Sequence, residues 1–230
     1  KYTRNIYAER NPGVVKELGD VGNDLQIYGN RLYAVINVSH LIEVMDVRTA
    51  KNIGKIYIPN CRYIVFKDGF AYVSSYAGPV QIDPNARLGY VAKVDTATLK
   101  VVAECPVGYQ PDELVISGDK LYVANSGGYR VPNYDKTISI IDLKTFTEEK
   151  KVDVAINLHR LELDNYGKIW VSSRGDYYKV PSKIFVFDPK TEQVTKTLDV
   201  SCSNMTLAGD SLFVYSTEWS YITGANTISY

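Results

Sequence analysis

The sequence lacks an excess of charge of either sign. Its 230 residues contain 26 Lys and Arg and 26 Asp and Glu, which gives a formal net charge of zero. A neutral chain has no electrostatic footprint for DNA or RNA, so nucleic acid is excluded as a predicted partner. The sequence also has no apolar run near the ~20 residues that a membrane helix needs.

Residues for metal and nucleophilic chemistry are also scarce. The two histidines, His40 and His159, lie far apart in the sequence, which excludes a multi-histidine metal site. The three cysteines, Cys61, Cys105 and Cys202, form no C-x-x-C pair, and we expect them to be small buried thiols. No G-x-S-x-G, G-x-G-x-x-G or P-loop motif is present, so the sequence predicts no cofactor, metal or catalytic residue.

The chain does contain a repeat. A short strand with an aromatic residue, a loop and an alternating strand ending in Asp recur four times. The terminal residues are Asp46, Asp95, Asp142 and Asp188, at intervals of 49, 47 and 46 residues, and a fifth copy begins at 212–214. A period in the forties with several strands per period is typical of a β-propeller. We therefore predict an all-β fold with four-stranded blades, about five of them in this chain.

The predicted blades follow this period. We expect an outer strand and link over residues 1–20, blades over 21–60, 61–108, 109–154 and 155–200, and a partial blade over 201–230. Gly, Asn and Asp pairs such as Gly29-Asn30 and Gly118-Asp119 predict tight turns between the first two strands of a blade. The Asp that ends each third strand is expected to bond the backbone N–H groups of the next turn.

The two ends of the chain allow two interpretations. Residues 1–8 resemble a fourth strand without its partners, and residues 227–230 resemble an interrupted third strand. The N-terminal strand could complete the last blade and close a ring of five. Alternatively, the chain is part of a longer propeller, which the interruption inside a strand favours.

The length of the repeat varies mainly in the loop between the second and third strands. In a four-stranded meander these loops lie on the same face as the links between blades, so we expect function on that face. Tyr, Trp and Arg combined with Gly, Ser and Asn are typical of recognition surfaces. The predicted ligand-binding residues are Arg62, Tyr76, Asn125, Tyr129, Arg130, Tyr134, His159, Arg160, Arg174, Tyr177, Tyr178 and Trp219.

Structural roles are open for several of these residues. Some tyrosines are expected to pack between blades, because strands favour Tyr in any case. Arg62 and Arg160 could instead pair with carboxylates and join adjacent blades. His159 is expected to line the central channel, and His40 to be exposed in the shortest loop.

The third repeat carries a family resemblance. Tyr122-Val123-Ala124-Asn125 followed by Thr137–Asp142, with Val107-Gly108 and Pro111 ahead of them, resembles the YVTN repeat of YncE-like propellers. Within that family the Tyr-rich loops are most similar to surface-layer lipoprotein propellers of Gram-negative gut bacteria. One branch, the BtuG-type proteins, captures cobalamin for an outer-membrane transporter.

This resemblance implies a seven-bladed, non-enzymatic protein at the cell surface or in the periplasm, of which this chain covers about five blades. It implies a small-molecule ligand, with cobalamin as the sharpest candidate, and an outer-membrane transporter as partner. A glycan-binding propeller or a scaffold for protein partners is an alternative. A lactonase- or quinoprotein-type enzyme is another, and it would depend on Asp112 and His159.

Overall fold

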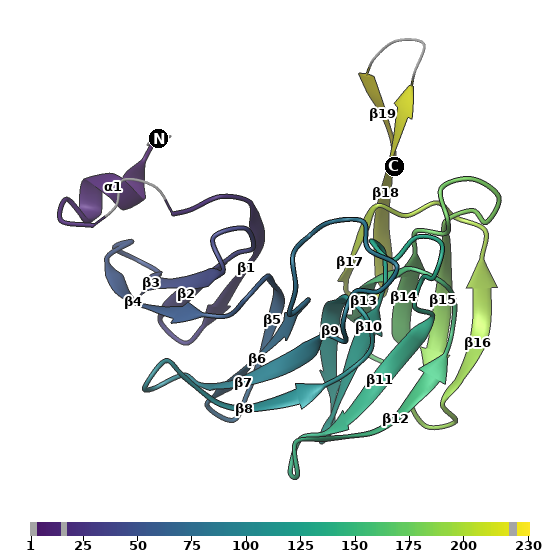
Figure 1. Cartoon of the computed structure of the whole chain (residues 1–230), viewed down its shortest axis with the longest axis horizontal. Coiled ribbons are helices and arrows are strands. Elements are labelled where there is room, and N and C mark those ends of the chain that lie inside the picture. Colours follow the sequence, from purple (N-terminus) through teal and green to yellow (C-terminus); the bar gives the residue numbers. More distant parts are fainter. Residues whose placement is uncertain (1–3, 15–17, 221–224) are drawn as a thin grey trace.

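The protein forms an arc of five antiparallel β-sheets, which confirms the predicted all-β propeller. The computed structural model describes residues 4–14, 18–220 and 225–230, with only the backbone described at 218–220. The sheets stand side by side, and the arc is open between the first and the fifth (Figure 1). Each innermost strand contacts the innermost strand of the next sheet, so these strands surround the centre of the arc.

Each sheet is a meander, in which neighbouring strands follow one another in the sequence. The first two sheets contain β1 (Gly22–Tyr28), β2 (Arg31–Ile36), β3 (Leu41–Asp46) and β4 (Asn52–Tyr57), then β5 (Cys61–Lys67), β6 (Phe70–Ser75), β7 (Tyr90–Asp95) and β8 (Lys100–Pro106). The next two contain β9 (Pro111–Ser117), β10 (Lys120–Asn125), β11 (Thr137–Asp142) and β12 (Thr147–Asp153), then β13 (Leu158–Leu163), β14 (Ile169–Ser173), β15 (Lys183–Asp188) and β16 (Gln193–Leu198). The fifth sheet has three described strands, β17 (Asn204–Ala208), β18 (Ser211–Ser220) and β19 (Ala225–Ser229).

The N-terminal segment is a helix, so the strand predicted over residues 1–8 is wrong; residues 1–3 lie outside the described residues. Helix α1 (Ile6–Arg10) lies on the face of the first sheet that points away from the second. Tyr7 is buried there against Ala34 and Met45, and its hydroxyl hydrogen-bonds the Glu43 carboxylate. The segment therefore caps the first blade and does not complete the fifth.

The Asp side chains that end the third strands accept the expected hydrogen bonds from the backbone of the next turn. In the second blade, Oδ1 of Asp95 accepts hydrogen bonds from the backbone N–H groups of Ala97 and Thr98, at 2.9 and 2.8 Å. Asp46, Asp142 and Asp188 cap their own turns in the same way. The turn around Tyr166-Gly167 is longer than the predicted two residues, because Leu163 pairs with Ile169 and the connection between them spans 164–168.

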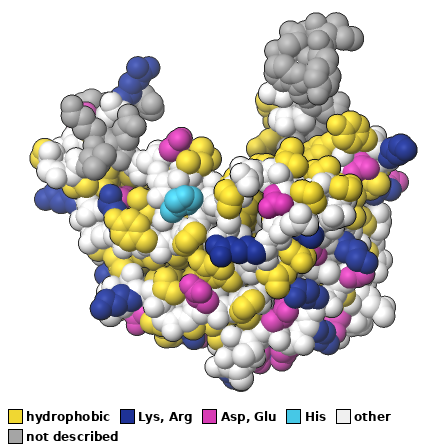
Figure 2. Space-filling view, viewed as in Figure 1, with side chains coloured by type: hydrophobic (Ala, Val, Ile, Leu, Met, Phe, Trp, Pro, Cys, Tyr) yellow, Lys and Arg dark blue, Asp and Glu magenta, His cyan; other side chains and the backbone are white. Residues whose placement is uncertain are grey.

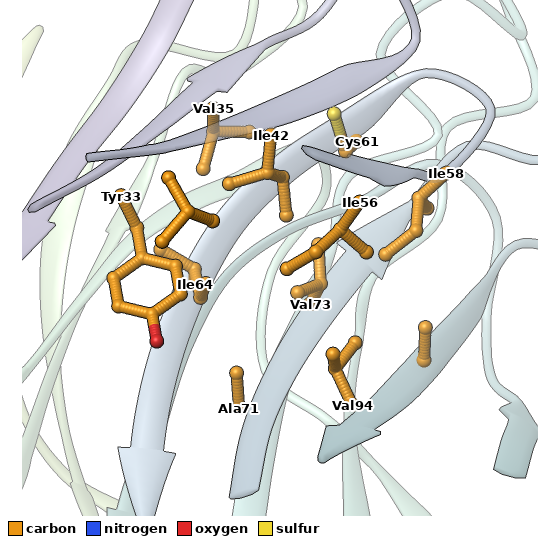
Figure 3. Packing of buried hydrophobic residues seen from close by; sticks show 12 residues of the cluster. Tyr33, Val35, Ile42, Ile56, Ile58, Cys61, Ile64, Ala71, Val73 and Val94 are labelled. Carbon is orange, nitrogen blue, oxygen red and sulfur yellow. The ribbon is translucent and has the colours of Figure 1, made fainter. Parts of the chain in front are cut away.

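The core lies between successive blades. Tyr33, Val35 and Ile42 of the first sheet point towards Ile64 and Val73 of the second (Figure 3). The face of each sheet thus packs against its neighbour, and burial of these apolar side chains fixes the rotation from blade to blade. The three cysteines are free and buried, as predicted.

A close approach between the second and third blades requires glycine at position 89. A Cβ there would lie 2.2 Å from Cδ of Pro111 and 2.6 Å from the carbonyl oxygen of Ser75. We expect Gly89→Ala to lower the free energy of unfolding by about 1–3 kcal/mol, because the backbone must shift to relieve the overlap. Urea denaturation measures this.

Gly22→Ala is the matched control. Gly22 also lies in the propeller, at the start of β1, but a Cβ there would meet no atom within 4 Å. We expect little change in stability from this substitution. Equal losses for the two variants would contradict the assignment of Gly89 to a steric contact.

Candidate functional site

The long loops and the links between blades are tied together on one face. The carbonyl of Asn60, in the link before β5, accepts a hydrogen bond from the backbone N–H of Tyr76, just after β6, at 3.2 Å. The same bond joins Asn157 to the N–H of Arg174 in the fourth blade, at 3.0 Å. Both asparagines have positive φ angles, 41° and 54°, which Asn tolerates better than most residues. The links and the loops therefore form one rigid rim, as the repeat spacing predicted.

Three successive inner strands begin with residues of complementary charge. Cys61, Pro111 and Leu158 occupy equivalent register positions, opposite the last residue of the second strand in each blade. The residues that follow them are Arg62, Asp112 and His159. The inner strands thus bring a cation, a carboxylate and an imidazole to the centre of the arc.

Asp112 is the hub of this group, which we call the central cluster: Arg62, Tyr76, Asp112, His159 and Arg174. The Asp112 side chain is fully buried. Its Oδ1 accepts from the Tyr76 hydroxyl at 2.8 Å and from Nε of Arg62 at 3.3 Å. Its Oδ2 lies 3.1 Å from Nδ1 of His159 and 3.3 Å from Nη1 of Arg174. One carboxylate therefore joins the second, third and fourth blades.

The charged neighbours determine the ionisation of Asp112. Burial alone would raise the pKa of this carboxyl, but Arg62, His159 and Arg174 outweigh burial and hold the pKa well below its usual range. The carboxylate is therefore ionised at any physiological pH.

Burial, aided by Arg174, holds His159 neutral. Nη2 of Arg174 lies 3.0 Å from Nε2 of His159, and a guanidinium can only donate, so Nε2 is the acceptor and the imidazole proton is on Nδ1. That proton faces Asp112. Burial, with a contribution from the Arg174 charge, lowers the pKa of His159 to about 4.

A second ion pair lies one residue further along the same strands. Arg160 and Glu113 are 3.0 Å apart, and the Arg160 guanidinium carbon lies 5.2 Å from the ring centroid of Tyr63. Oε2 of Glu113 also accepts the backbone N–H of Leu161 at 2.7 Å. Burial raises the pKa of Glu113, and Arg160 opposes the change. Arg160 thus joins adjacent blades, which is the structural alternative that the sequence left open.

A cavity of about 620 Å³ lies above the central cluster, and we call it the tyrosine cavity. It is lined by Arg62, Ile82, Gly128, Tyr129, Val131, Tyr134, Arg174, Tyr177 and Tyr178. Six of the predicted ligand-binding residues, two arginines and four tyrosines, therefore meet in one cavity although they come from two loops and one inner strand.

The loops around this cavity are fixed by backbone bonds. The N–H of Asp83 donates to the carbonyl of Tyr129 at 2.8 Å, and the N–H of Tyr129 donates to Oε1 of Gln110 at 2.7 Å. In the fourth blade, Oδ1 of Asp176 accepts three consecutive N–H groups, those of residues 178–180. Gly175 is required beside it, because a Cβ there would lie 1.9 Å from the carbonyl oxygen of Val180.

The other predicted residues lie outside the cavity lining. Asn125 is fully buried, and its amide bonds the N–H of Gly108 and the hydroxyls of Thr137 and Ser139. The Arg130 guanidinium carbon lies 3.5 Å from the ring centroid of Tyr109.

Tyr76 and His159 are buried within the central cluster, and His159 lies among the inner strands, as expected for the channel. His40 is exposed, as predicted. The side chain of Trp219, in β18, lies outside the described residues.

Asp112 was missing from the predicted ligand-binding residues, although the cluster is built around it. The signal in the sequence is its register: it stands at the start of an inner strand, where the neighbouring blades carry Arg62 and His159. Aligning the repeats on their inner strands, and not on their terminal Asp residues, would have found the group.

The described region shows few features of other site classes. Basic and acidic side chains are interspersed over the face shown in Figure 2, without a field of one sign. Among the described residues, no group of three or more His, Cys, Asp or Glu is placed to hold a metal ion. No helix in the described ranges has the length and hydropathy to cross a membrane.

Comparisons with known proteins support the fold. No family model matches the chain, and no curated protein does. Among solved structures, the chain is similar to the hydrazine synthase of Kuenenia stuttgartiensis, with a TM-score of 0.65 and 19% identity over 77% of this chain and 48% of that one. It is also similar to the dihydro-heme d1 dehydrogenase NirN in complex with DHE, with a TM-score of 0.56 and 13% identity over 78% of this chain and 38% of that one.

These likenesses show a β-propeller fold. The chain spans less than half the length of the two solved structures. The YncE-like and BtuG-type resemblance is not tested by them and stays a prediction.

The hub role of Asp112 predicts a large stability effect. Asp112→Asn keeps the shape of the side chain but leaves two largely buried guanidinium groups without a counter-charge. We expect the free energy of unfolding to fall by about 3–5 kcal/mol, as measured by urea denaturation at pH 7. Asp153→Asn is the control, because the Lys136–Asp153 pair is exposed and its loss should change little. Equal stability of the Asp112 variant and the wild type would contradict the role of the hub.

The low pKa of His159 predicts a pH dependence. The unfolded chain binds a proton on this residue below about pH 6.5, whereas the folded protein does not until about pH 4. Relative to a His159→Gln variant, the wild type should therefore lose stability as the pH falls from about 6.5 to about 4. Thermal unfolding of both proteins across this range measures the difference, and a constant difference would disprove the assignment.

Proposed function

We propose that this chain is a ligand-binding β-propeller that captures, in the tyrosine cavity, a small molecule that carries an anionic group. The observation that carries the proposal is the position of Arg62 and Arg174, which line that cavity above a single buried carboxylate. Two guanidinium charges, one carboxylate and a neutral His159 leave the central cluster with one uncompensated positive charge. An anion in the cavity would neutralise it.

The arginines have donors available for such a ligand. Arg62 uses Nε for Asp112, and neither of its terminal nitrogens donates to a described acceptor. A guanidinium with both terminal groups free suits a carboxylate or a phosphate, which it can bind through two parallel hydrogen bonds. The cavity also restricts water around the pair, which strengthens the attraction.

The tyrosines suit a large ligand with flat faces. Tyr177 and Tyr178 are 66% and 92% exposed, so they have no packing role in the unliganded fold. Tyrosine rings provide rigid contact area at a small cost in conformational entropy, and their hydroxyls can bond polar edges. Cobalamin offers amide groups, a phosphate and a broad ring system, and it is the candidate that the family resemblance suggests. A position at the cell surface or in the periplasm, with an outer-membrane transporter as partner, belongs to the same proposal.

The geometry favours binding over catalysis by the residues available. To act as a general base, His159 would need a free ring nitrogen facing the substrate. Here Nδ1 of His159 faces Asp112 and Nε2 faces Arg174, so both nitrogens are engaged inside the cluster. The two similar proteins are named as enzymes, but identities of 19% and 13% support the fold alone.

Titration with cyanocobalamin, followed by calorimetry, tests the proposal. Tyr177→Ala should weaken binding about tenfold or more without loss of stability, because the side chain contacts solvent in the free protein. Tyr166→Ala is the control, since Tyr166 is equally exposed but lies in the turn between β13 and β14, away from the cavity.

Two further ligands test which chemical feature of the ligand is bound. Dicyanocobinamide, which lacks the phosphate, should bind more weakly than cyanocobalamin if the arginines bind an anion. Hemin is the second probe, because one similar structure carries DHE and hemin is a flat anionic macrocycle. Absence of binding by all three ligands at high micromolar concentration would refute a tetrapyrrole-type macrocycle as the ligand.

A further inference from the structure

A second cavity lies on the other side of the loop that follows β6. Its volume is about 760 Å³, and its walls include Val38, His40, Pro59, Asn60, Val80 and Gln110. Residues 76–83 separate it from the tyrosine cavity: Ile82 lines the tyrosine cavity, and Gln81 and Asp83 line the second one. We call it the amide cavity, because its two most buried polar side chains are carboxamides.

Gln110 presents an unused donor to this cavity. Its side chain is only 2% exposed, and its Oε1 accepts the backbone N–H of Tyr129 at 2.7 Å. This bond fixes which end of the amide is oxygen, because a backbone N–H can only donate. Among the described residues, Nε2 of Gln110 donates to no acceptor, and the residue lines the cavity.

Asn60 presents the complementary acceptor. Its side chain is 4% exposed, and its Nδ2 donates to the carbonyl of Gly78. That bond identifies Nδ2 as the end of the Asn60 amide that is already bonded. The other end, Oδ1, accepts no hydrogen bond from a described residue. Nδ1 of His40 accepts the backbone N–H of Asn60 at 3.0 Å, which places the proton of a neutral His40 on Nε2 as a further donor.

The charge of the amide cavity differs from that of its neighbour. Its ionisable lining residues are Asp83, Arg87 and His40, so with a neutral imidazole the formal charges cancel. Part of the remaining wall is apolar, with Pro59, Val38 and Val80 among its residues. An uncharged ligand with one amide and an apolar group fits these surfaces.

We propose that the amide cavity binds an N-acetylated sugar. The acetamido carbonyl accepts from Nε2 of Gln110, the acetamido N–H donates to Oδ1 of Asn60, and the methyl group contacts the proline and valine walls. The sugar hydroxyls reach His40 and Asp83 at the edge of the cavity. This site is independent of the ligand in the tyrosine cavity.

Binding of N,N′-diacetylchitobiose to the whole chain, measured by calorimetry, tests the proposal. Cellobiose is the matched sugar, because it has the same linkage and lacks the acetamido groups. We expect saturable binding of the acetylated disaccharide, at least about tenfold tighter than that of cellobiose. Equal binding of the two sugars, or no binding at millimolar concentration, would overturn the proposal.

Two variants locate the site. Gln110→Glu keeps an oxygen for the Tyr129 N–H and removes the donor, so binding of the acetylated sugar should fall about tenfold or more. Val38→Trp obstructs the cavity from an exposed position and should abolish binding without affecting the fold. Tyr177→Ala, in the other cavity, should leave sugar binding unchanged. Full binding by both amide-cavity variants would place the sugar elsewhere and refute the assignment.

Discussion

The buried carboxylate of Asp112 is the constraint on which the centre of this propeller depends. The inner strands of three blades meet there. Arg62, from the inner strand of the second blade, and Arg174, from the loop after β14, bring two guanidinium groups into the same small volume. Without a carboxylate between them, Arg62 and Arg174 would repel each other in a region with little water. Asp112 therefore sets both the packing of the blades and the position of the arginines that form the floor of the tyrosine cavity.

The cluster is not what stability alone would favour. Replacing buried ion pairs by apolar residues of similar volume is often neutral or stabilising, so a charged centre is weak evidence for stability. This cluster also keeps one positive charge more than it neutralises, because two guanidinium groups share one carboxylate while burial, aided by Arg174, holds His159 neutral. A polar group retained at a cost in stability is typical of a site that completes its bonding with a ligand.

The repeat made the blades predictable, because each depends on local signals. A terminal Asp that caps the next turn, as at Asp95, needs only neighbouring residues. The partners of Asp112 lie about fifty residues away on either side, and a sequence repeat does not indicate the direction in which a side chain points. Asn125 ends β10 at the start of a long loop, a position from which we predicted a ligand contact. Its amide instead points inward and bonds Gly108. The N-terminal segment alternates like a strand, but burial of Tyr7 on the first blade selects a helix.

One methylene group distinguishes the link of the third blade from the equivalent links in this rim. Asn60, Gln110 and Asn157 occupy equivalent links, and each carbonyl accepts the first N–H of the loop beside it. The two asparagines also use their amide nitrogens for their own loops, on the carbonyls of Gly78 and Gly175. The longer side chain of Gln110 reaches the N–H of Tyr129 with its oxygen instead, and no described residue accepts a hydrogen bond from its nitrogen. The repeat thus preserves the backbone of the rim, while a change of one residue type releases a donor into the neighbouring cavity.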